Sequence, residues 1–309
     1  MSRLLALLNS RAGTMHDVGA ARIRDALKAL ERDGRTVEIR MIEPKRIYAE
    51  LLAAAASDFD TVVIGGGDGS VNCAAGVFAE AGKTLGVLPF GTVNLFARDL
   101  GMPAGVEDAI AALHDARPRR VDLAGLNGRP FHSLSGLGFF SQMARAREET
   151  RGHPLGRMAS VMVAALRAIR RSGRFTIDLE ADGRSERVEA LAVLVTNNRF
   201  GADWRRPRLD AGELEIHIVE DKGALARLKA SADLLTGTWR DNPGIRSFTA
   251  RELTIDRSRQ RTWIATDGEL ARARLPLRYG IRPAALTVLG IADVGPAADD
   301  VAAATSAEP

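Results

Sequence analysis

The sequence is poor in the residues that build disulfide-bonded or zinc-dependent folds. It contains one cysteine, Cys73, and five histidines in 309 residues. A single cysteine cannot form an internal disulfide, and cysteine-rich zinc sites are excluded for the same reason. No run of 18 or more apolar residues occurs, because the opening apolar segment 4–8 is followed at once by Asn9 and Arg11. These absences predict a cytosolic protein that does not span a membrane.

There is also little excess of one charge. The 43 Lys and Arg residues against 39 Asp and Glu residues give a net charge of +4, with 46% hydrophobic residues. These values are typical of globular proteins and exclude collagen-like, disordered and coiled-coil chains. They also predict no nucleic-acid partner. The basic residues are nevertheless unevenly placed, since segment 145–174 has eight arginines and two acids, and Trp204 begins a second basic cluster that extends to Arg208.

Strand-like and helix-like segments alternate through the first 100 residues. Strands are predicted at 4–8, 36–42, 61–64 and 85–88, and helices at 18–30, 45–56, 71–81 and 94–100. This alternation is typical of βαβ units and a parallel sheet covered on both faces.

From about Val121 most segments are extended. Strands are predicted at 131–135, 175–180, 188–196, 214–219, 252–256, 262–265 and 275–281, and helices at 139–149, 155–171 and 224–235. The sequence therefore predicts an α/β fold with an N-terminal parallel-sheet domain (1–121) and a C-terminal, mainly antiparallel β domain (122–291). The tail 292–309 is predicted to be disordered.

A glycine-rich loop, residues 65–70 (Gly-Gly-Gly-Asp-Gly-Ser), follows the third predicted strand. Glycines permit positive φ and a close ligand approach, while main-chain N–H groups at a helix N-terminus attract phosphate. The loop matches neither of the two common phosphate-binding patterns, G-x-x-x-x-G-K-[ST] and G-x-G-x-x-G. An aspartate here would repel phosphate unless it handles a metal ion or a proton. The loop indicates an anion site with a chemical role for Asp68, and a plain turn is the alternative.

Two further polar turns are candidates for the same chemistry. In residues 89–94, Thr92 and Asn94 offer a hydroxyl and an amide just after a strand, although an ordinary helix N-cap also explains them. Late in the chain, Asp267 and Glu269 flank a glycine, and two such carboxylates can act as general base and metal ligand. Asp-Gly is also the commonest hairpin signal, so a plain turn is the alternative reading.

Together and in this order, the motifs resemble those of the diacylglycerol kinase catalytic-domain family, which includes bacterial lipid kinases and the sphingosine and ceramide kinases. The matching segments are 9–13 (Asn-Ser-Arg-Ala-Gly), 66–72 (Gly-Gly-Asp-Gly-Ser-Val-Asn), 91–97 (Gly-Thr-Val-Asn-Leu-Phe-Ala) and 267–269 (Asp-Gly-Glu). The resemblance extends from Arg3 to about Gly290. It implies a nucleotide-binding first domain and a kinase that transfers the γ-phosphate of ATP, with Mg²⁺, to the hydroxyl of diacylglycerol or a similar lipid.

The resemblance also implies the site residues. Those expected to bind ATP are Asn9, Ser10, Arg11, Ala12, Gly13, Thr14, Gly66, Gly67, Asp68, Gly69, Ser70, Val71, Asn72, Gly91, Thr92 and Asn94. Asp267 is expected to be the base that deprotonates the acceptor, with Glu269 supporting it or binding Mg²⁺, and these two roles can be exchanged. Asp68 is expected to be catalytic and a second Mg²⁺ ligand.

The sequence departs from the family pattern at several positions, among them Ser70, which replaces threonine but keeps the hydroxyl, and 41–43, where the usual threonine is missing. Leu95 and Cys73 stand where aspartate and glutamate are frequent, and Ala211 replaces the second aspartate of an Asp-Asp-Gly segment. A structural magnesium site would therefore depend on Asp210 alone.

Two alternatives stay open on the sequence. NAD kinase shares the Gly-Gly-Asp-Gly loop but lacks the second motif and the late Asp-Gly-Glu. A nucleotide-sensing or membrane-binding module that has lost catalysis would not need Asp68 or the pair Asp267 and Glu269. For a lipid kinase we expect cytoplasmic localisation with peripheral attachment to an anionic membrane through the arginine-rich stretch 155–174 and Trp204. A homodimer and the identity of the lipid acceptor are left open.

Overall fold

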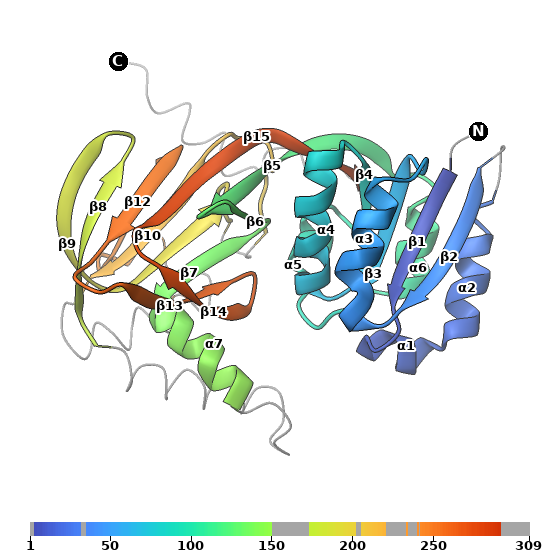
Figure 1. Cartoon of the computed structure of the whole chain (residues 1–309), viewed down its shortest axis with the longest axis horizontal. Helices are drawn as coiled ribbons and strands as arrows, with labels where there is room; N and C mark the ends of the chain where they lie inside the picture. Colours follow the sequence, from blue (N-terminus) through green and yellow to red (C-terminus); the bar gives the residue numbers. More distant parts are fainter. Residues whose placement is uncertain are drawn as a thin grey trace. The chain divides into compact units, whose positions relative to one another are not determined.

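The computed structural model describes residues 3–31, 35–149, 173–201, 205–220, 233, 240 and 242–291. The chain divides into two compact units (Figure 1). Unit 1 comprises Met1–Leu123, Arg205–Ala211 and Pro283–Pro309, and unit 2 comprises Ala124–Trp204 and Gly212–Arg282. The predicted helix 155–171, nearly all of the predicted helix 224–235, Trp204 and the tail 292–309 lie outside the described residues.

Unit 1 is built on a parallel sheet with helices along the chain between its strands. Its strands are β1 (Arg3–Asn9), β2 (Thr36–Ile42), β3 (Thr61–Gly66) and β4 (Thr84–Pro89), joined by the end of β15 (Leu277–Gly290). Its described helices are α1 (Gly13–Val18), α2 (Ala20–Lys28), α3 (Ile47–Ala55), α4 (Asp68–Ala81), α5 (Leu95–Asp99) and α6 (Val106–Ala112), with a 3₁₀ turn η1 (Pro44–Arg46). The strand order β2-β1-β3-β4-β15 is parallel throughout, which confirms the predicted class of this unit.

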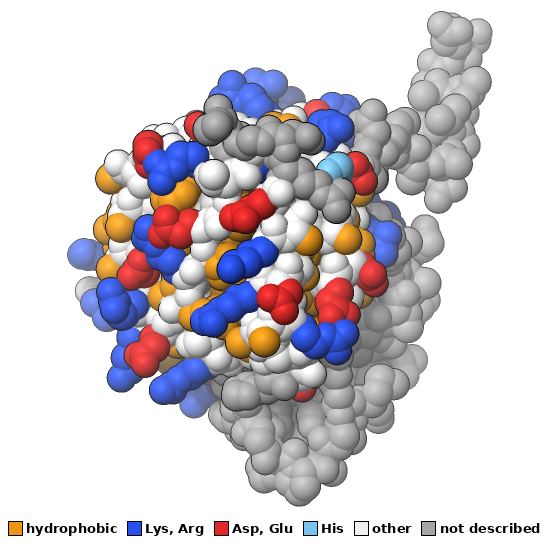
Figure 2. All heavy atoms as spheres, turned by 90° about the vertical axis from the view of Figure 1, so that its right-hand side faces the viewer, with side chains coloured by type: hydrophobic (Ala, Val, Ile, Leu, Met, Phe, Trp, Pro, Cys, Tyr) orange, Lys and Arg blue, Asp and Glu red, His pale blue; other side chains and the backbone are white. Residues whose placement is uncertain are grey.

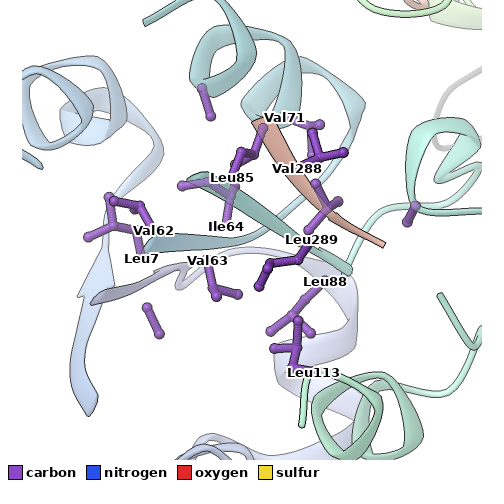
Figure 3. Close-up of a cluster of buried hydrophobic side chains, with 14 of the residues drawn as sticks. Leu7, Val62, Val63, Ile64, Val71, Leu85, Leu88, Leu113, Val288 and Leu289 are labelled. Atoms are coloured by element: carbon purple, nitrogen blue, oxygen red, sulfur yellow. The ribbon is translucent and has the colours of Figure 1, made fainter. Parts of the chain in front are cut away.

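The inner strands of this sheet are buried on both faces. Leu4 to Leu8 of β1 and Val62 to Ile64 of β3 are at most 3% exposed. Continuous apolar runs of this kind are typical of strands covered by helices on each side. Figure 3 shows their side chains packed with Leu85 and Leu88 of β4 and with Val288 and Leu289 of β15. The edge strand β2 has one fully buried residue, Ile42.

Helix α4 is placed by its two ends and its buried face. It begins after Gly67 and ends at Gly82, whose φ of 66° is left-handed, a common way to stop a helix. Its buried residues Val71, Ala74, Ala75 and Phe78 recur at helical spacing. The glycine-rich loop is therefore held as the entry to a helix that packs on the sheet.

Unit 2 is mainly antiparallel, as the sequence predicts. Its described elements are β6 (Arg129–Phe131), β7 (Leu134–Gly138), α7 (Phe139–Glu149), β8 (Phe175–Ala181), β9 (Arg184–Asn197), β10 (Leu214–Glu220), β11 (Ile245–Ala250), β12 (Glu252–Asp256), β13 (Arg261–Thr266), β14 (Glu269–Arg274) and the start of β15. Along one path the strands lie in the order β14-β13-β7-β9-β8-β12-β15, and β10 joins β9 to β11. β5 (Arg117–Leu126) and β15 both run from one unit into the other. None of the described helices is long and apolar enough to cross a bilayer.

The chain passes between the two units four times, whereas the sequence prediction divides it once, at residue 121. Segment 205–211 returns to unit 1, where Arg206 forms an ion pair with Asp99. The guanidinium Nη2 lies 2.6 Å from Asp99 Oδ2, and both side chains are at most 1% exposed. The main-chain N–H of Arg206 also donates to Asp99 Oδ1 at 3.1 Å. The ion pair could not be predicted from a local sequence pattern, because Asp99 and Arg206 are 107 residues apart.

Replacing Asp99 with alanine leaves the buried Arg206 guanidinium without its carboxylate. We expect the free energy of unfolding to fall by about 3–5 kcal/mol, because an uncompensated buried charge is costly. Urea unfolding measures this difference. The matched control is Arg208→Ala, which breaks the exposed pair with Asp210 and should cost less than about 1 kcal/mol. Equal losses in the two variants would contradict the anchoring role of Asp99.

Candidate functional site

Three loops of unit 1 lie next to one another at the carboxyl ends of adjacent parallel strands. β3 pairs with β1 on one side and with β4 on the other, so the loops that follow these three strands are neighbours. The Thr14 hydroxyl, in α1, donates to the Phe90 carbonyl oxygen at 3.2 Å and so joins the first loop to the third. This edge of an open parallel sheet is where such folds bind ligands.

The first loop is braced by its own polar groups. The Arg11 main-chain N–H donates to Asn9 Oδ1 at 3.0 Å, and the Ser10 hydroxyl donates to the Ile42 carbonyl oxygen at 3.1 Å. Gly13 then opens α1, and a Cβ built on it would meet nothing within 4 Å. The predicted segment 9–14 therefore forms one ordered turn between β1 and α1.

The glycines of the second and third loops are required by close contact. A Cβ on Gly91 would lie 2.7 Å from the Gly67 Cα, and a Cβ on Gly66 would lie 2.7 Å from the Ser70 Cβ. None of Gly65, Gly66, Gly67 and Gly91 has a positive φ. Gly91 is needed because the main chains of the two loops touch there, and Gly66 is needed because the Ser70 side chain lies against it.

Asp68 and Asn94 connect the glycine-rich loop to the third loop. Asp68 lies in the first turn of α4, and its Oδ2 accepts the Asn94 main-chain N–H at 3.3 Å. The Asn94 side chain binds both the N–H and the carbonyl of Gly91, at 2.8 and 2.7 Å. It makes no capping bond to α5, so Asn94 braces the turn instead of capping the helix. Gly69, Ser70, Val71 and Asn72 continue into α4, and Thr92 lies in the turn between Gly91 and Asn94.

The Asp-Gly-Glu motif forms the tip of the β13–β14 hairpin in unit 2. Thr266 pairs with Glu269, which leaves Asp267 and Gly268 as a two-residue turn, with φ values of 47° and 85°. Two left-handed residues define the turn that matches the twist of paired strands. The hairpin interpretation of the motif is therefore confirmed, and it leaves open a chemical role for the two carboxylates.

The two carboxylates of this motif have opposite environments. The Asp267 side chain is 1% exposed. Its Oδ1 accepts the N–H groups of Ser133 and Leu134, both at 3.0 Å, and its Oδ2 accepts that of His132 at 2.9 Å. Three of the roughly four acceptor positions of a carboxylate are thus used by main-chain donors. The Glu269 side chain is exposed, and its carboxylate forms no ion pair within the part of the chain that the structure describes.

A buried polar chain lies beside Asp267. The Ser135 hydroxyl is 3.1 Å from the Thr266 hydroxyl and 3.2 Å from the Tyr279 phenol oxygen. Burial raises the pKa of Tyr279 to about 12, although the hydrogen bond with Ser135 opposes the shift. Tyr279 therefore stays neutral at physiological pH and takes part in this chain through the hydrogen bond with Ser135. The sequence offered no signal for segment 132–134 or for Tyr279, because both act through tertiary contacts with Asp267 and its neighbours.

Metal ligands are not assembled within the described residues. No group of three or more His, Cys, Asp or Glu side chains there could hold an ion. Asp210, the one residue left for a structural magnesium site, is exposed and its Oδ1 accepts Arg208 Nε at 3.2 Å.

Two family profiles match this chain, one in its N-terminal part and one in its C-terminal part. The family profile described as "Diacylglycerol kinase catalytic domain" matches residues 3–126, and the one described as "YegS C-terminal NAD kinase beta sandwich-like domain" matches residues 138–290. A protein of Pseudomonas aeruginosa strain UCBPP-PA14, named "Probable lipid kinase YegS-like", is 31% identical over 215 residues, which are 65% of this chain and 68% of that protein. The chain belongs to the diacylglycerol kinase catalytic-domain family. The resemblance read from the four motifs is thereby confirmed.

Other similar proteins share a smaller fraction of identical residues with this chain. A "Diacylglycerol kinase" of Staphylococcus haemolyticus is 28% identical over 250 residues, covering 75% of each chain. An uncharacterized Synechocystis protein is 28% identical over 187 residues, and the match spans 43% of its length and 59% of this chain. The crystal structure of a diacylglycerol kinase from Bacillus anthracis strain Sterne shares the fold, with a TM-score of 0.72, 20% identity, and coverage of 94% of this chain and 97% of that one.

The environments of Asp267 and Glu269 predict unequal effects on stability. In Asp267→Asn the amide NH₂ faces a main-chain donor, so we expect the free energy of unfolding to fall by about 1–3 kcal/mol. Glu269→Gln changes an exposed side chain and should stay within about 0.5 kcal/mol of the parent. Thermal and urea unfolding of both variants measure the difference. If Asp267→Asn is as stable as Glu269→Gln, the three main-chain bonds do not contribute as described.

Proposed function

We propose that the protein is a lipid kinase that transfers the γ-phosphate of ATP to a hydroxyl group of diacylglycerol or a similar lipid. The observation that carries the proposal is the contact of the loops after β3 and β4, with Asp68 at the start of α4. The membership of the family and the names of its relatives support the kinase class. The choice of nucleotide and of acceptor is part of the proposal.

The residues of unit 1 fit a nucleotide bound with Mg²⁺. Main-chain N–H groups in the first turn of α4, beside the Gly67–Gly91 contact, carry partial positive charge that suits the phosphates of ATP. The Asp68 carboxylate supplies one Mg²⁺ ligand. Mg²⁺ is usually held by one or two carboxylates together with substrate phosphates and waters, so a preformed cluster of three protein ligands is not needed. When bound, the ion neutralises charge on the phosphates.

In this reaction the protein has two tasks. It positions the acceptor hydroxyl against the γ-phosphate, and it accepts the proton of that hydroxyl. The acceptor hydroxyl oxygen forms the new bond to the γ-phosphorus, the bond to the oxygen of the ADP leaving group breaks, and the hydroxyl proton passes to a carboxylate. We assign this proton transfer to the Asp267–Glu269 pair, with Asp267 as the base and Glu269 in support or as a metal ligand. The exposure of Glu269 makes the exchanged assignment equally testable.

The lipid acceptor requires access to a membrane surface. Arg174, which ends the arginine-rich stretch 155–174, is exposed, while Arg167, Arg170, Arg171 and Trp204 lie outside the described residues. Each basic residue near an anionic leaflet contributes about 1 kcal/mol of attraction. We propose peripheral binding to anionic membranes through this segment, at the cytoplasmic face.

Asp68→Asn tests the phosphate site. The amide keeps the shape and the acceptor for the Asn94 N–H but loses the charge, so we expect turnover to fall by at least about 10²-fold without loss of stability. Transfer of labelled phosphate from ATP to a total lipid extract measures turnover, and the labelled lipid identifies the acceptor. Asp25→Asn, an exposed acid on α2, should leave turnover unchanged. Turnover of Asp68→Asn equal to the parent, or transfer to NAD and not to lipid, would refute the proposal.

Glu269→Gln and Asp267→Asn separate the two roles in proton transfer. Loss of the base should lower turnover by about 10²–10⁴-fold, with ATP binding nearly unchanged. A loss in Asp267→Asn counts only after correction for the folded fraction, whereas a loss in Glu269→Gln reports chemistry directly. If both variants retain parental turnover, neither carboxylate is the base.

A further inference from the structure

Unit 2 contains a pocket of about 440 Å³ whose charged lining is entirely basic. It is formed by the start of α7, the start of β8, the segment between β12 and β13, and the β13–β14 hairpin. Its arginines are Arg174, Arg257, Arg259, Arg261 and Arg272. No aspartate or glutamate is among its described lining residues. All of the lining residues belong to unit 2, so the glycine loops of unit 1 form no part of it.

Most of these guanidinium groups lack a carboxylate. Among the described residues, Arg257, Arg259, Arg261 and Arg272 form no ion pair, while Arg174 lies 3.7 Å from Glu189 in a pair whose two side chains are more than half exposed. The pKa of Arg257 is lowered, first by burial and then by the neighbouring charge of Arg259. Guanidinium groups keep their charge under such conditions, so the pocket is a concentrated field of one sign.

The fold holds the arginines in this arrangement. Trp263 and Arg272 are directly opposite each other on β13 and β14, and the Arg272 guanidinium lies 5.3 Å from the centre of the indole ring. Arg257 stacks over Phe175 at 4.5 Å. Contacts of a cation with an aromatic face orient a guanidinium without neutralising it.

The N-terminus of α7 adds to the positive potential. Gly138 and Ser141 line the pocket at the start of this 11-residue helix, where main-chain N–H groups carry partial positive charge. Gly138 has a φ of 71°, and a side chain on it would collide with the Leu191 carbonyl oxygen. The Ser141 hydroxyl donates to the Gly138 carbonyl oxygen at 2.9 Å, which fixes this turn beside the arginines.

Another face of the protein carries basic and acidic side chains side by side. The face drawn in Figure 2, which carries α2 and β2, has basic and acidic side chains interspersed. Arginines of unit 1 there pair with acids, as Arg22 does with Glu107 at 2.8 Å and Arg40 with Glu38 at 2.6 Å. An unneutralised group of arginines lowers stability through repulsion, and an anionic ligand in this concave site would relieve that repulsion.

We infer that this pocket binds a phosphate group that carries two or more negative charges. Planar guanidinium groups bind phosphate oxygens in pairs, and arginine is the residue that proteins use for this recognition. The pocket volume lies in the range of small-molecule sites. The phosphate can belong to the headgroup of a lipid, such as a phosphomonoester lipid, or to a soluble anion. The inference does not depend on the kinase proposal, because it needs neither ATP nor Mg²⁺.

The test compares two pairs of substitutions with equal charge change. Arg259→Gln with Arg272→Gln alters the pocket. Arg251→Gln with Arg278→Gln alters two exposed arginines of unit 2 that do not line it. Calorimetric titration with inorganic pyrophosphate, at constant ionic strength and without Mg²⁺, measures the soluble arm. Co-sedimentation with phosphatidylcholine vesicles that contain phosphatidic acid measures the lipid arm, against vesicles with phosphatidylglycerol at equal surface potential.

We expect the pocket pair to weaken binding by about tenfold or more in at least one arm, and the control pair by less than about twofold. Loss of pyrophosphate binding alone identifies a soluble anion. Loss of the preference for phosphatidic acid over phosphatidylglycerol identifies a lipid headgroup. If the two pairs behave alike in both arms, or if the parent binds neither probe, the inference is overturned.

A stability measurement guards against a misfolded variant. Without ligand at low salt, the pocket pair should unfold at the same temperature as the control pair or higher, because it relieves repulsion. Pyrophosphate should raise the unfolding temperature of the parent and of the control pair but not of the pocket pair. Should the double variant be unstable, Arg259→Gln alone, in an exposed loop, provides the same comparison.

Discussion

The main-chain contact between Gly67 and Gly91 is the constraint on which the candidate nucleotide site depends. Adjacent parallel strands bring their carboxyl ends together, and the two loops meet only because Gly91 has no Cβ, which would lie 2.7 Å from the Gly67 Cα. Asn94 holds the Gly91 turn from within, and Asp68 receives the Asn94 N–H. Gly67 and Gly91, the Asn94 amide and the Asp68 carboxylate therefore depend on one another for their positions.

Unit 1 is completed by segments that are far away in the sequence. The end of β15 pairs with β4, and segment 205–211 returns to be anchored by the Asp99–Arg206 pair. A buried ion pair often gives less net stability than an apolar contact of the same size. Any arrangement that separates the two side chains, however, leaves a buried charge without its partner, which is strongly unfavourable. The pair therefore specifies where the returning segment docks.

Unit 2 uses its charged side chains in two ways that burial separates. Asp267 is enclosed and accepts three main-chain N–H groups, so it holds segment 132–134 against the hairpin tip. Further along the same hairpin, Arg261 and Arg272 line a pocket without compensating acids. One hairpin thus presents carboxylates at its tip and guanidinium groups along its strands.

The sequence by itself determined the fold class, the order of the first strands and helices, and the family. These follow from local periodicity and from four motifs whose residues are close together in the chain. Only the tertiary structure decided that Asp267 is buried while Glu269 is exposed, that Asn94 braces a turn instead of capping a helix, and that the glycines serve a close approach. It also extended β15 into the parallel sheet and brought together the arginines of the pocket from the start of β8, the segment between β12 and β13, and the β13–β14 hairpin. The reason is physical: burial, hydrogen-bond saturation and like-charge clustering depend on residues that meet across long sequence separations, which no local pattern records.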